Sequence, residues 1–381
     1  MENNLIKIFE DTVISNHDTG NTINSLIKLN IIDIDDLTEE IIDTYNKEYI
    51  YNFAKYIDND YNDLLAEAIS NTKDPEYIYL FARDIKDAPV KMLQNSIIRT
   101  REPKYIYLFA KDVKESDPDC IAYYLPRCEW SSKYVYLFAK HFKDIRFREF
   151  APNIIDSGSS ETIYKYARDI DGAPIDELAN TIIEHNNKKY IYLFAKDVKN
   201  APIDKLAEAL VKGCRFYHGN NIENTYIYLF AKYVKNAPID MLAERIANAY
   251  ITPKFIYLFA KNIKNAPIDI LITPILWWRI PKYLYLFAKN VKNANIDKLT
   301  DAIIQTKNIE YINLFKEKID GVDINKLNNA LDNIRKEKLE QDKYNMLINL
   351  VNEKQYQIIL ENQEEFTNLI NNKKLIKKKT K

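Results

Sequence analysis

The sequence predicts an all-α protein, an α-solenoid of ten to eleven helix-turn-helix repeats of about 28 residues with a C-terminal helical cap. One observation is a recurring Tyr-Leu-Phe-Ala core, complete at 192–195, within which apolar residues follow helical spacing. The other is its period: the steps are 28 or 29 residues, with one step of 36. The aromatic third position of the core is Phe53, Phe81, Phe109, Phe138, Tyr166, Phe194, Phe230, Phe259, Phe287 and Phe315.

The first helix of a repeat is represented by residues 190–199. Ile191, Phe194, Ala195 and Val198 fall at i, i+3, i+4 and i+7, which is one face of an α-helix. A second stripe of this helix is also mainly apolar. We therefore expect it to be covered on more than one side, as stacking between neighbouring repeats requires.

A column of small polar residues follows the first helices. Its members are Asn59, Asp87, Glu115, Asp144, Gly172, Asn200, Asn236, Asn265, Asn293 and Gly321. Asn, Asp and Gly tolerate the left-handed backbone that ends many helices, so the column predicts positive φ angles.

The second helix of a repeat is represented by Ile203–Val211. An Ala-Pro pair precedes it in five repeats, and proline suits the first turn of a helix. Asp204 lies in that turn, where a carboxylate favours the helix dipole. A short polar link, often with proline, returns the chain to the next repeat.

Four segments divide the chain. Residues 1–45 form a degenerate capping repeat, in which Ile34–Ile42 matches a second helix and Ile23–Leu29 a first helix. The array covers 46–327, a helical cap 328–371, and a basic disordered tail 372–381.

Two repeats depart from the pattern in their second halves, at 115–132 and 143–160. Proline occurs inside both segments, at Pro126 and Pro152 among other positions. Because proline inside a helix costs roughly 3 kcal/mol, we expect these second helices to be short or bent.

Composition limits the setting of the protein. Lys plus Arg number 54 and Asp plus Glu 55, a net charge of −1 that argues against general coating of nucleic acid. Cys120, Cys128 and Cys214 lack a CxxC pair and fit free thiols in an intracellular, reducing setting. The start of the chain lacks a signal-peptide pattern, and no stretch is long and apolar enough to predict a membrane span.

The repeated unit Tyr-Ile-Tyr-Leu-Phe-Ala-Lys, followed by Lys-Asn-Ala-Pro-Ile-Asp, resembles repeats in uncharacterised proteins of giant DNA viruses of the mimivirus type. The resemblance covers residues 46–327. It implies a viral protein made in an infected cell, with the host cytoplasm as the expected location and the virion or nucleus as alternatives. It implies no chemistry.

The sequence predicts that the protein is not an enzyme and uses no cofactor or metal. It contains no GxGxxG, GxxxxGK[ST], HExxH or GxSxG motif. Its histidines, His17, His141, His185 and His218, lie in different units without metal-ligand spacing. The repeated first-turn aspartates are explained by helix capping.

Two segments outside the repeat allow two interpretations each. The insertion at 211–224 contains Cys214, Arg215, Tyr217 and His218 and is either a binding loop or a tolerated surface loop, which we favour. The lysine-rich end at 372–381 is either a nuclear-import or nucleic-acid patch or a solvated terminus, and we favour the terminus.

The sequence leaves two functions open. The first is a scaffold that binds a protein partner along its surface, as α-solenoids do. The second is binding of single-stranded nucleic acid through a stripe of the first helix that pairs a tyrosine with two cations. Its members are Tyr79, Arg83, Lys86, Tyr107, Lys111, Lys114, Tyr136, Lys140, Lys143, Tyr192, Lys196, Lys199, Tyr228, Lys232, Lys235, Tyr257, Lys261, Lys264, Tyr285, Lys289 and Lys292. We favour the scaffold, since a position kept the same in every repeat is what stacking demands.

Overall fold

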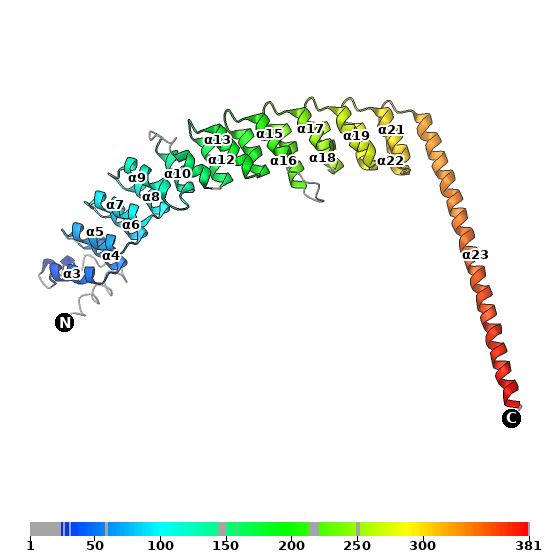
Figure 1. The fold of residues 1–381 in the computed structure, drawn as a ribbon, viewed down its shortest axis with the longest axis horizontal. Helices are drawn as coiled ribbons and strands as arrows, with labels where there is room; N and C mark the ends of the chain where they lie inside the picture. Colours follow the sequence, from blue (N-terminus) through cyan, green and yellow to red (C-terminus); the bar gives the residue numbers. More distant parts are fainter. Residues whose placement is uncertain are drawn as a thin grey trace. The chain divides into compact units, whose positions relative to one another are not determined.

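The computed structural model confirms an all-α repeat solenoid (Figure 1). Every regular element in the part of the chain it describes is helical. It comprises two compact units: unit 1, residues 1–213 and 233–237, and unit 2, residues 214–232 and 238–381. The residues described are 24–25, 27–29, 32–57, 60–143, 150–157, 159–212, 221–248 and 252–379.

Unit 1 is a stack of helix pairs that lie side by side in Figure 1. It opens with α3 (Ile34–Asp43), the second helix predicted for the capping repeat, whereas most of the segment 1–31 lies outside the described residues. The first helices are α4 (Lys47–Tyr56), α6 (Pro75–Asp84), α8 (Pro103–Asp112), α10 (Ser132–His141), α12 (Ser160–Asp169) and α14 (Lys188–Asp197). The second helices are α5 (Asn62–Asn71), α7 (Val90–Thr100), α9 (Pro118–Tyr124) with the 3-10 turn η3 (Leu125–Arg127), α11 (Ala151–Asp156), α13 (Ile175–Glu184) and α15 (Ile203–Val211).

Unit 2 continues the same alternation. Its helices are α16 (Asn221–Tyr233, to residue 232 in this unit), α17 (Ile239–Asn248), α18 (Pro253–Asn262), α19 (Ile268–Trp278), α20 (Pro281–Asn290), α21 (Ile296–Gln305), α22 (Ile309–Lys318) and α23 (Ile324–Lys379). First helices pack on first helices, as α18 on α20 and α20 on α22, and second helices on second helices, as α17 on α19.

The aromatic residues that recur in the sequence also form the repeating core of the structure. All ten aromatic core positions, nine phenylalanines and Tyr166, are fully buried and are the largest such side chains in the structure's described part. Each stands between its own second helix and the neighbouring repeats, so a single repeat could not bury it alone.

The first helices end two residues earlier than the sequence predicts. α14 stops at Asp197, and Val198 is extended although still buried. Asn200 has a φ of 60°, and the N–H of Ala201 bonds to the carbonyl of Val198 at 3.4 Å. Positive φ at the third residue of such a turn is the type II pattern, which favours Asn or Gly. The column therefore shapes a turn one step beyond the helix, and is not its cap.

Positive φ itself is confirmed along this column. The angles lie between 54° and 80° at Asp87, Glu115, Gly172, Asn200, Asn236, Asn265, Asn293 and Gly321. Asn59 and Asp144 lie outside the described residues.

A second left-handed column lies at the turn from each second helix to the next first helix, and the sequence did not predict it. Its residues, with φ of 50–58°, are Tyr45, Lys73, Arg101, Trp130, Asn186, Arg279 and Lys307. In several repeats a threonine precedes it, as Thr72 does, whose hydroxyl donates to the Ile69 carbonyl at 2.6 Å and accepts the N–H of Asp74. This bridge fixes the turn without the glycine that left-handed backbone usually selects.

The prolines have roles other than those predicted. Pro75, Pro103, Pro253 and Pro281, assigned to a link, are the first residues of their helices. Pro202 and its equivalents instead stand immediately before the second helices. Both arrangements use positions where an N–H is not needed.

The two irregular second helices are short, as predicted, with α9 at seven and α11 at six residues. At the other end, one helix, α23, runs through the segment predicted as a helical cap at 328–371 and on into the tail predicted at 372–381. It continues to Lys379 because nothing in 366–379 breaks a helix: the segment contains neither proline nor glycine.

Candidate functional site

The tyrosines of the predicted stripe lie between repeats. Tyr79, Tyr136, Tyr192 and Tyr257 are buried, and Tyr107, Tyr228 and Tyr285 are half-buried. Several pack their rings near a tyrosine of the following first helix, as Tyr79 does with Tyr105 at a centroid distance of 6.2 Å. Their faces therefore cannot serve as open stacking platforms for bases.

Their hydroxyls form a ladder from one repeat to the next. In unit 1 the hydroxyl donates to an aspartate in the following first helix, 33 residues on. The pairs are Tyr51 with Asp84 at 2.6 Å, Tyr79 with Asp112 at 2.9 Å, Tyr136 with Asp169 at 2.7 Å, and Tyr164 with Asp197 at 2.7 Å. This aspartate column follows the stripe's first cation directly in the sequence, and it was not predicted.

We call each tyrosine–aspartate hydrogen bond a rung of the ladder. In unit 1 the first cation of the stripe, four residues after the tyrosine, adds a contact to each rung. Lys140 Nζ lies 3.3 Å from the Tyr136 hydroxyl and 2.9 Å from an Asp169 oxygen. The other cations pair with the aspartate that follows them in the sequence. The pairs are Arg83 with Asp84 and Arg168 with Asp169, both at 2.6 Å, Lys111 with Asp112 at 3.4 Å, and Lys196 with Asp197 at 3.3 Å. In unit 1 these cations therefore stand beside carboxylates.

The ladder shifts the pKa values of its members in opposite directions. The Arg168 guanidinium holds the pKa of the Asp169 carboxyl well below its usual range, with help from Lys140 and Tyr136. Burial raises the pKa of Tyr136, and its hydrogen bond to Asp169 raises it further. The aspartate is therefore ionised and the tyrosine protonated, which is the combination that a donating hydroxyl requires.

Unit 2 has asparagines at two of the positions that correspond to these aspartates, Asn262 and Asn290. Asn262 donates its side-chain amide to the Tyr228 hydroxyl, and Asn290 donates to that of Tyr257, both at 3.0 Å. The hydrogen bond between neighbouring repeats is kept, but the negative charge that the aspartate carries in unit 1 is absent. Lys261 and Lys289 lie over the rings of Tyr257 and Tyr285 and have no ion pair within the described residues.

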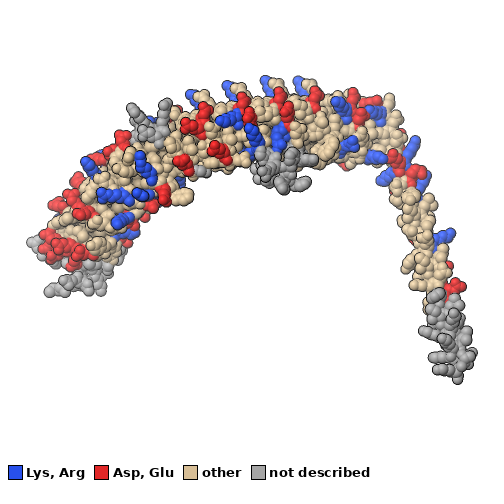
Figure 2. Space-filling model, in the orientation of Figure 1, with Lys and Arg blue, Asp and Glu red and all other residues tan. Residues whose placement is uncertain are grey.

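The second cation of the stripe does not join the first. Lys86, Lys114, Lys143, Lys199, Lys235, Lys264 and Lys292 are exposed on the turns that follow the first helices. On the face drawn in Figure 2, blue and red side chains are interspersed over the helices of unit 1. The stripe is thus divided between a part-buried ladder and separate turn lysines.

The loop residues Cys214, Arg215, Tyr217 and His218 lie outside the described residues. Cys120 and Cys128 are free thiols, and burial raises the pKa of Cys128, which makes it a poor nucleophile. The described residues contain no group of His, Cys, Asp and Glu that could hold a metal. No helix among them is long and apolar enough to cross a membrane.

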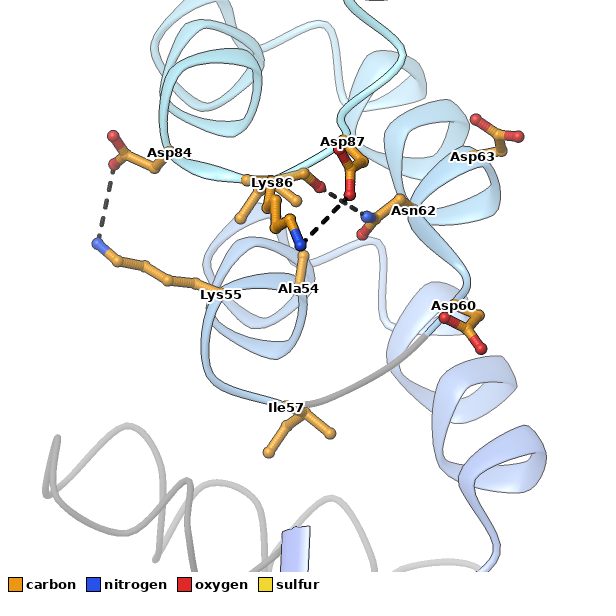
Figure 3. A pocket seen from close by; sticks show the side chains of 10 residues that line it. Ala54, Lys55, Ile57, Asp60, Asn62, Asp63, Asp84, Lys86 and Asp87 are labelled. Carbon is orange, nitrogen blue, oxygen red and sulfur yellow. Dashed lines mark hydrogen bonds and ion pairs between the residues drawn. The ribbon is translucent and has the colours of Figure 1, made fainter.

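A hollow of about 780 Å³ lies beside the turns of the first two repeats (Figure 3). Four aspartates and two lysines are among its lining residues, and Asp84 is paired with Lys55 at 3.8 Å and Asp87 with Lys86 at 3.9 Å. Asn62 donates to the Lys86 carbonyl at 2.9 Å and joins the two repeats across it. Two of its polar contacts, Lys55 with Asp84 and Asn62 with the Lys86 carbonyl, join neighbouring repeats, and it offers no catalytic arrangement.

Two exposed clusters break the repeat pattern, and we call them the edge clusters. The first comprises Tyr123, Tyr124, Arg127 and Trp130 of unit 1, and Trp130 is 90% exposed. The Arg127 guanidinium lies 3.7 Å from the centre of the Tyr123 ring. A surface hollow of about 580 Å³ adjoins Trp130.

The second edge cluster belongs to unit 2 and comprises Trp277, Trp278, Arg279 and Ile280. Trp277 is 67% exposed and packs edge-on against Trp278 at 5.1 Å. Arg279 and Trp130 hold the same left-handed position, so both clusters lie at a turn from a second to a first helix. They were not predicted from the sequence, because the prediction followed positions that recur and these residues do not.

No protein-family model matches the chain, and no curated protein matches it.

Proposed function

We propose that the protein is a non-enzymatic intracellular scaffold that binds a protein partner through its edge clusters. The observation that carries the proposal is the exposure of Trp130, Trp277 and Trp278 at turns where stacking does not require them. Trp, Tyr and Arg are the residue types that dominate binding energy in protein interfaces.

The repeated residues support this division of roles. The ladder explains why the tyrosines and their first cations recur, since each rung joins two repeats. Recognition is then left to positions that differ between repeats, and the edge clusters place exposed aromatic side chains at such positions in both units. Exposed aromatic side chains flanked by arginine mark an interaction surface more than a tolerated solvent face.

The test begins with the tagged full-length chain, purified from cells that make it, and identification of both bound protein and bound RNA. Affinity of the purified partner is then measured for Trp130→Ala and for Trp277→Ala/Trp278→Ala. We expect at least one variant to lose about 30-fold, the effect of a hot-spot residue. Leu64→Ala, an exposed apolar position of α5, is the matched control and should bind as wild type.

Wild-type affinity in both edge-cluster variants would overturn the assignment of the interface. Recovery of RNA without any stoichiometric protein would overturn the scaffold itself.

Unit 2 gives a reason to retain single-stranded nucleic acid as a second candidate. Between residues 252 and 296 there are six lysines and Arg279 but one carboxylate, Asp269. Lys261 and Lys289 lack the carboxylate that accompanies their equivalents in unit 1. Cations of this kind follow a nucleic-acid backbone and release counterions on binding.

Binding of a single-stranded RNA would be measured against salt for two variants with the same change of charge. Lys261→Glu/Lys289→Glu should reduce affinity and flatten the salt slope by about 0.7 for each phosphate that is no longer neutralised. Lys111→Glu/Lys196→Glu, at paired positions, should have the smaller effect. Equal reductions in the two variants would assign the binding to general charge and remove this candidate.

A further inference from the structure

α23 continues far beyond its contact with the repeats. Its start packs against α21 and α22 and buries Leu327 and Leu331. Every residue from 335 to 365 is exposed. Helices gain most of their stability from packing an apolar face, and the seven asparagines between 345 and 372 disfavour a solitary helix.

The exposed part carries an apolar stripe with an 11-residue repeat. Tyr344, Leu347, Ile348 and Val351 fall at i, i+3, i+4 and i+7, and Ile358 and Ile359 repeat the central pair 11 residues later. These six side chains are 40–60% exposed, and Figure 2 shows a largely uncharged surface along the middle of α23. Eleven residues make three helical turns, so the stripe stays on one face and suits packing along another helix.

The apolar pattern of the stripe is symmetric in sequence about Ile358 and Ile359. The central pair recurs a third time at Leu369 and Ile370, so the spacing reads the same forwards and backwards about Ile358 and Ile359. The two polar positions within the stripe, Gln355 and Asn362, are placed symmetrically about that centre. From residue 347 to 370, an antiparallel copy of the helix would therefore meet apolar positions with apolar positions and Gln355 with Asn362, whereas Tyr344 would face Lys373.

Charge favours the same orientation. Residues 372–381 contain six lysines, and four of the five charged residues in 353–365 are glutamates. A parallel, in-register pair would place the six lysines beside their own copy, where like charges repel, whereas the glutamates surround the centre and face their own copy in either orientation. An antiparallel pair moves the lysines to opposite ends, beside residues 336–345, where Glu337, Glu340 and Asp342 balance Lys336, Lys338 and Lys343.

From these observations we propose that α23 is a dimerisation helix, which binds a second copy of this chain in an antiparallel pair along residues 347–370. The pair is about 36 Å long at 1.5 Å per residue. The stripe carries specificity through its symmetric polar pair, as buried polar residues do in other helical pairs.

The test is the mass of the full-length chain in solution, by light scattering at concentrations up to about 100 μM. We expect twice the 44.9 kDa of one chain. Leu347→Glu/Ile358→Glu, on the stripe, should return the monomer mass while the circular dichroism of the repeats is retained. Met346→Glu/Leu360→Glu adds the same charge to exposed apolar positions of α23 outside the stripe, and should stay dimeric.

Orientation is read from lysine crosslinks between isotopically light and heavy chains. The antiparallel register predicts light–heavy crosslinks between Lys343 and Lys374. Crosslinks that join Lys374 of one chain to Lys374 of another would overturn the orientation. A monomer mass throughout, a dimer that survives the stripe variant, or a monomer that binds phosphatidylcholine–phosphatidylserine vesicles through the stripe would overturn the proposal.

Discussion

The hydroxyl of Tyr136 donates a 2.7 Å hydrogen bond to Asp169, which lies in the first helix of the next repeat. The same aspartate accepts from Lys140 at 2.9 Å, and Arg168 pairs with it at 2.6 Å. Three donors from two repeats therefore meet one half-buried carboxylate. The geometry makes this rung a contact between repeats, in addition to the aromatic core.

Tyr136→Phe removes the donating hydroxyl but keeps the ring. We expect a loss of about 1 kcal/mol in the free energy of unfolding, because Asp169 keeps its other two donors. Tyr136→Ala should cost about 3–5 kcal/mol, as large aromatic truncations do. Urea unfolding followed by circular dichroism measures both.

Tyr107→Phe is the control for this rung. Tyr107 occupies the same repeat position, but His141 stands where the aspartate would be, and no hydrogen bond of its hydroxyl is present among the described residues. Its replacement should change stability by a few tenths of a kcal/mol. Equal losses at Tyr107 and Tyr136 would show that the hydroxyl contact contributes nothing.

Asp169→Asn tests the charge of the rung through pH. The pKa of Asp169 is lowered by folding, chiefly by Arg168, so its contribution is present above the unfolded value of about 3.9 and is lost as pH falls toward the folded value. We expect wild type to exceed Asp169→Asn by about 1–3 kcal/mol at pH 7 and 5. The difference should shrink between about pH 4 and 2, and a constant difference would contradict the ionised rung.

The fold could be predicted from the sequence because one period and one helical spacing recur through most of the chain. Phe194 and its equivalents define the repeat in the sequence, and the same residues form the buried core. Their burial is therefore the physical reason that they recur. Positive φ at Asn200 was predictable for a similar reason, since its residue type is itself the signal.

The contacts that the sequence did not predict include ones that join two different repeated positions. The ladder joins a tyrosine to an aspartate 33 residues away, which becomes visible when two columns are compared with a shift of one repeat. Lys73 is left-handed without being Gly or Asn, and the threonine bridge of Thr72 fixes that turn; Trp130 has the same conformation without a preceding threonine. Trp277 and the other edge residues occur once each, so a search for repeated positions passes over them.

Substitutions at Asn200 distinguish the effect of backbone conformation on stability from the effect of side-chain contacts. Asn200→Gly should be neutral or mildly stabilising, because glycine adopts a φ of 60° without strain. Asn200→Val should cost about 1–2 kcal/mol, since a β-branched residue is strained there. Thermal melting of the two variants checks the expectation, and equal melting temperatures would contradict a left-handed requirement.

Lys73 makes the corresponding test for the second left-handed column. Its φ is 56°, and its side chain is exposed. Lys73→Gly should therefore stabilise the protein by about 0.5–1 kcal/mol. Lys91→Gly, an exposed position inside α7, should destabilise by about 1 kcal/mol. A loss of stability in both variants would show that the turn does not strain its lysine.

The asparagine rungs of unit 2 connect stability to the choice between the two proposed functions. Asn262→Asp/Asn290→Asp rebuilds the unit 1 arrangement, with the Tyr228 and Tyr257 hydroxyls donating to carboxylates and a negative charge beside Lys261 and Lys289. Charge-assisted hydrogen bonds are the stronger kind, so thermal stability at pH 7 should be unchanged or higher by up to about 1 kcal/mol.

The same double variant removes the excess of positive charge next to those lysines. If unit 2 binds single-stranded RNA, its affinity at low salt should fall and its salt slope should flatten, while the fold becomes no weaker. If unit 2 contributes to a protein scaffold alone, RNA retention should be weak in both proteins and insensitive to RNA length. A clear drop in melting temperature would show instead that the asparagines are required by packing, and the amide rung would then carry no information about ligands.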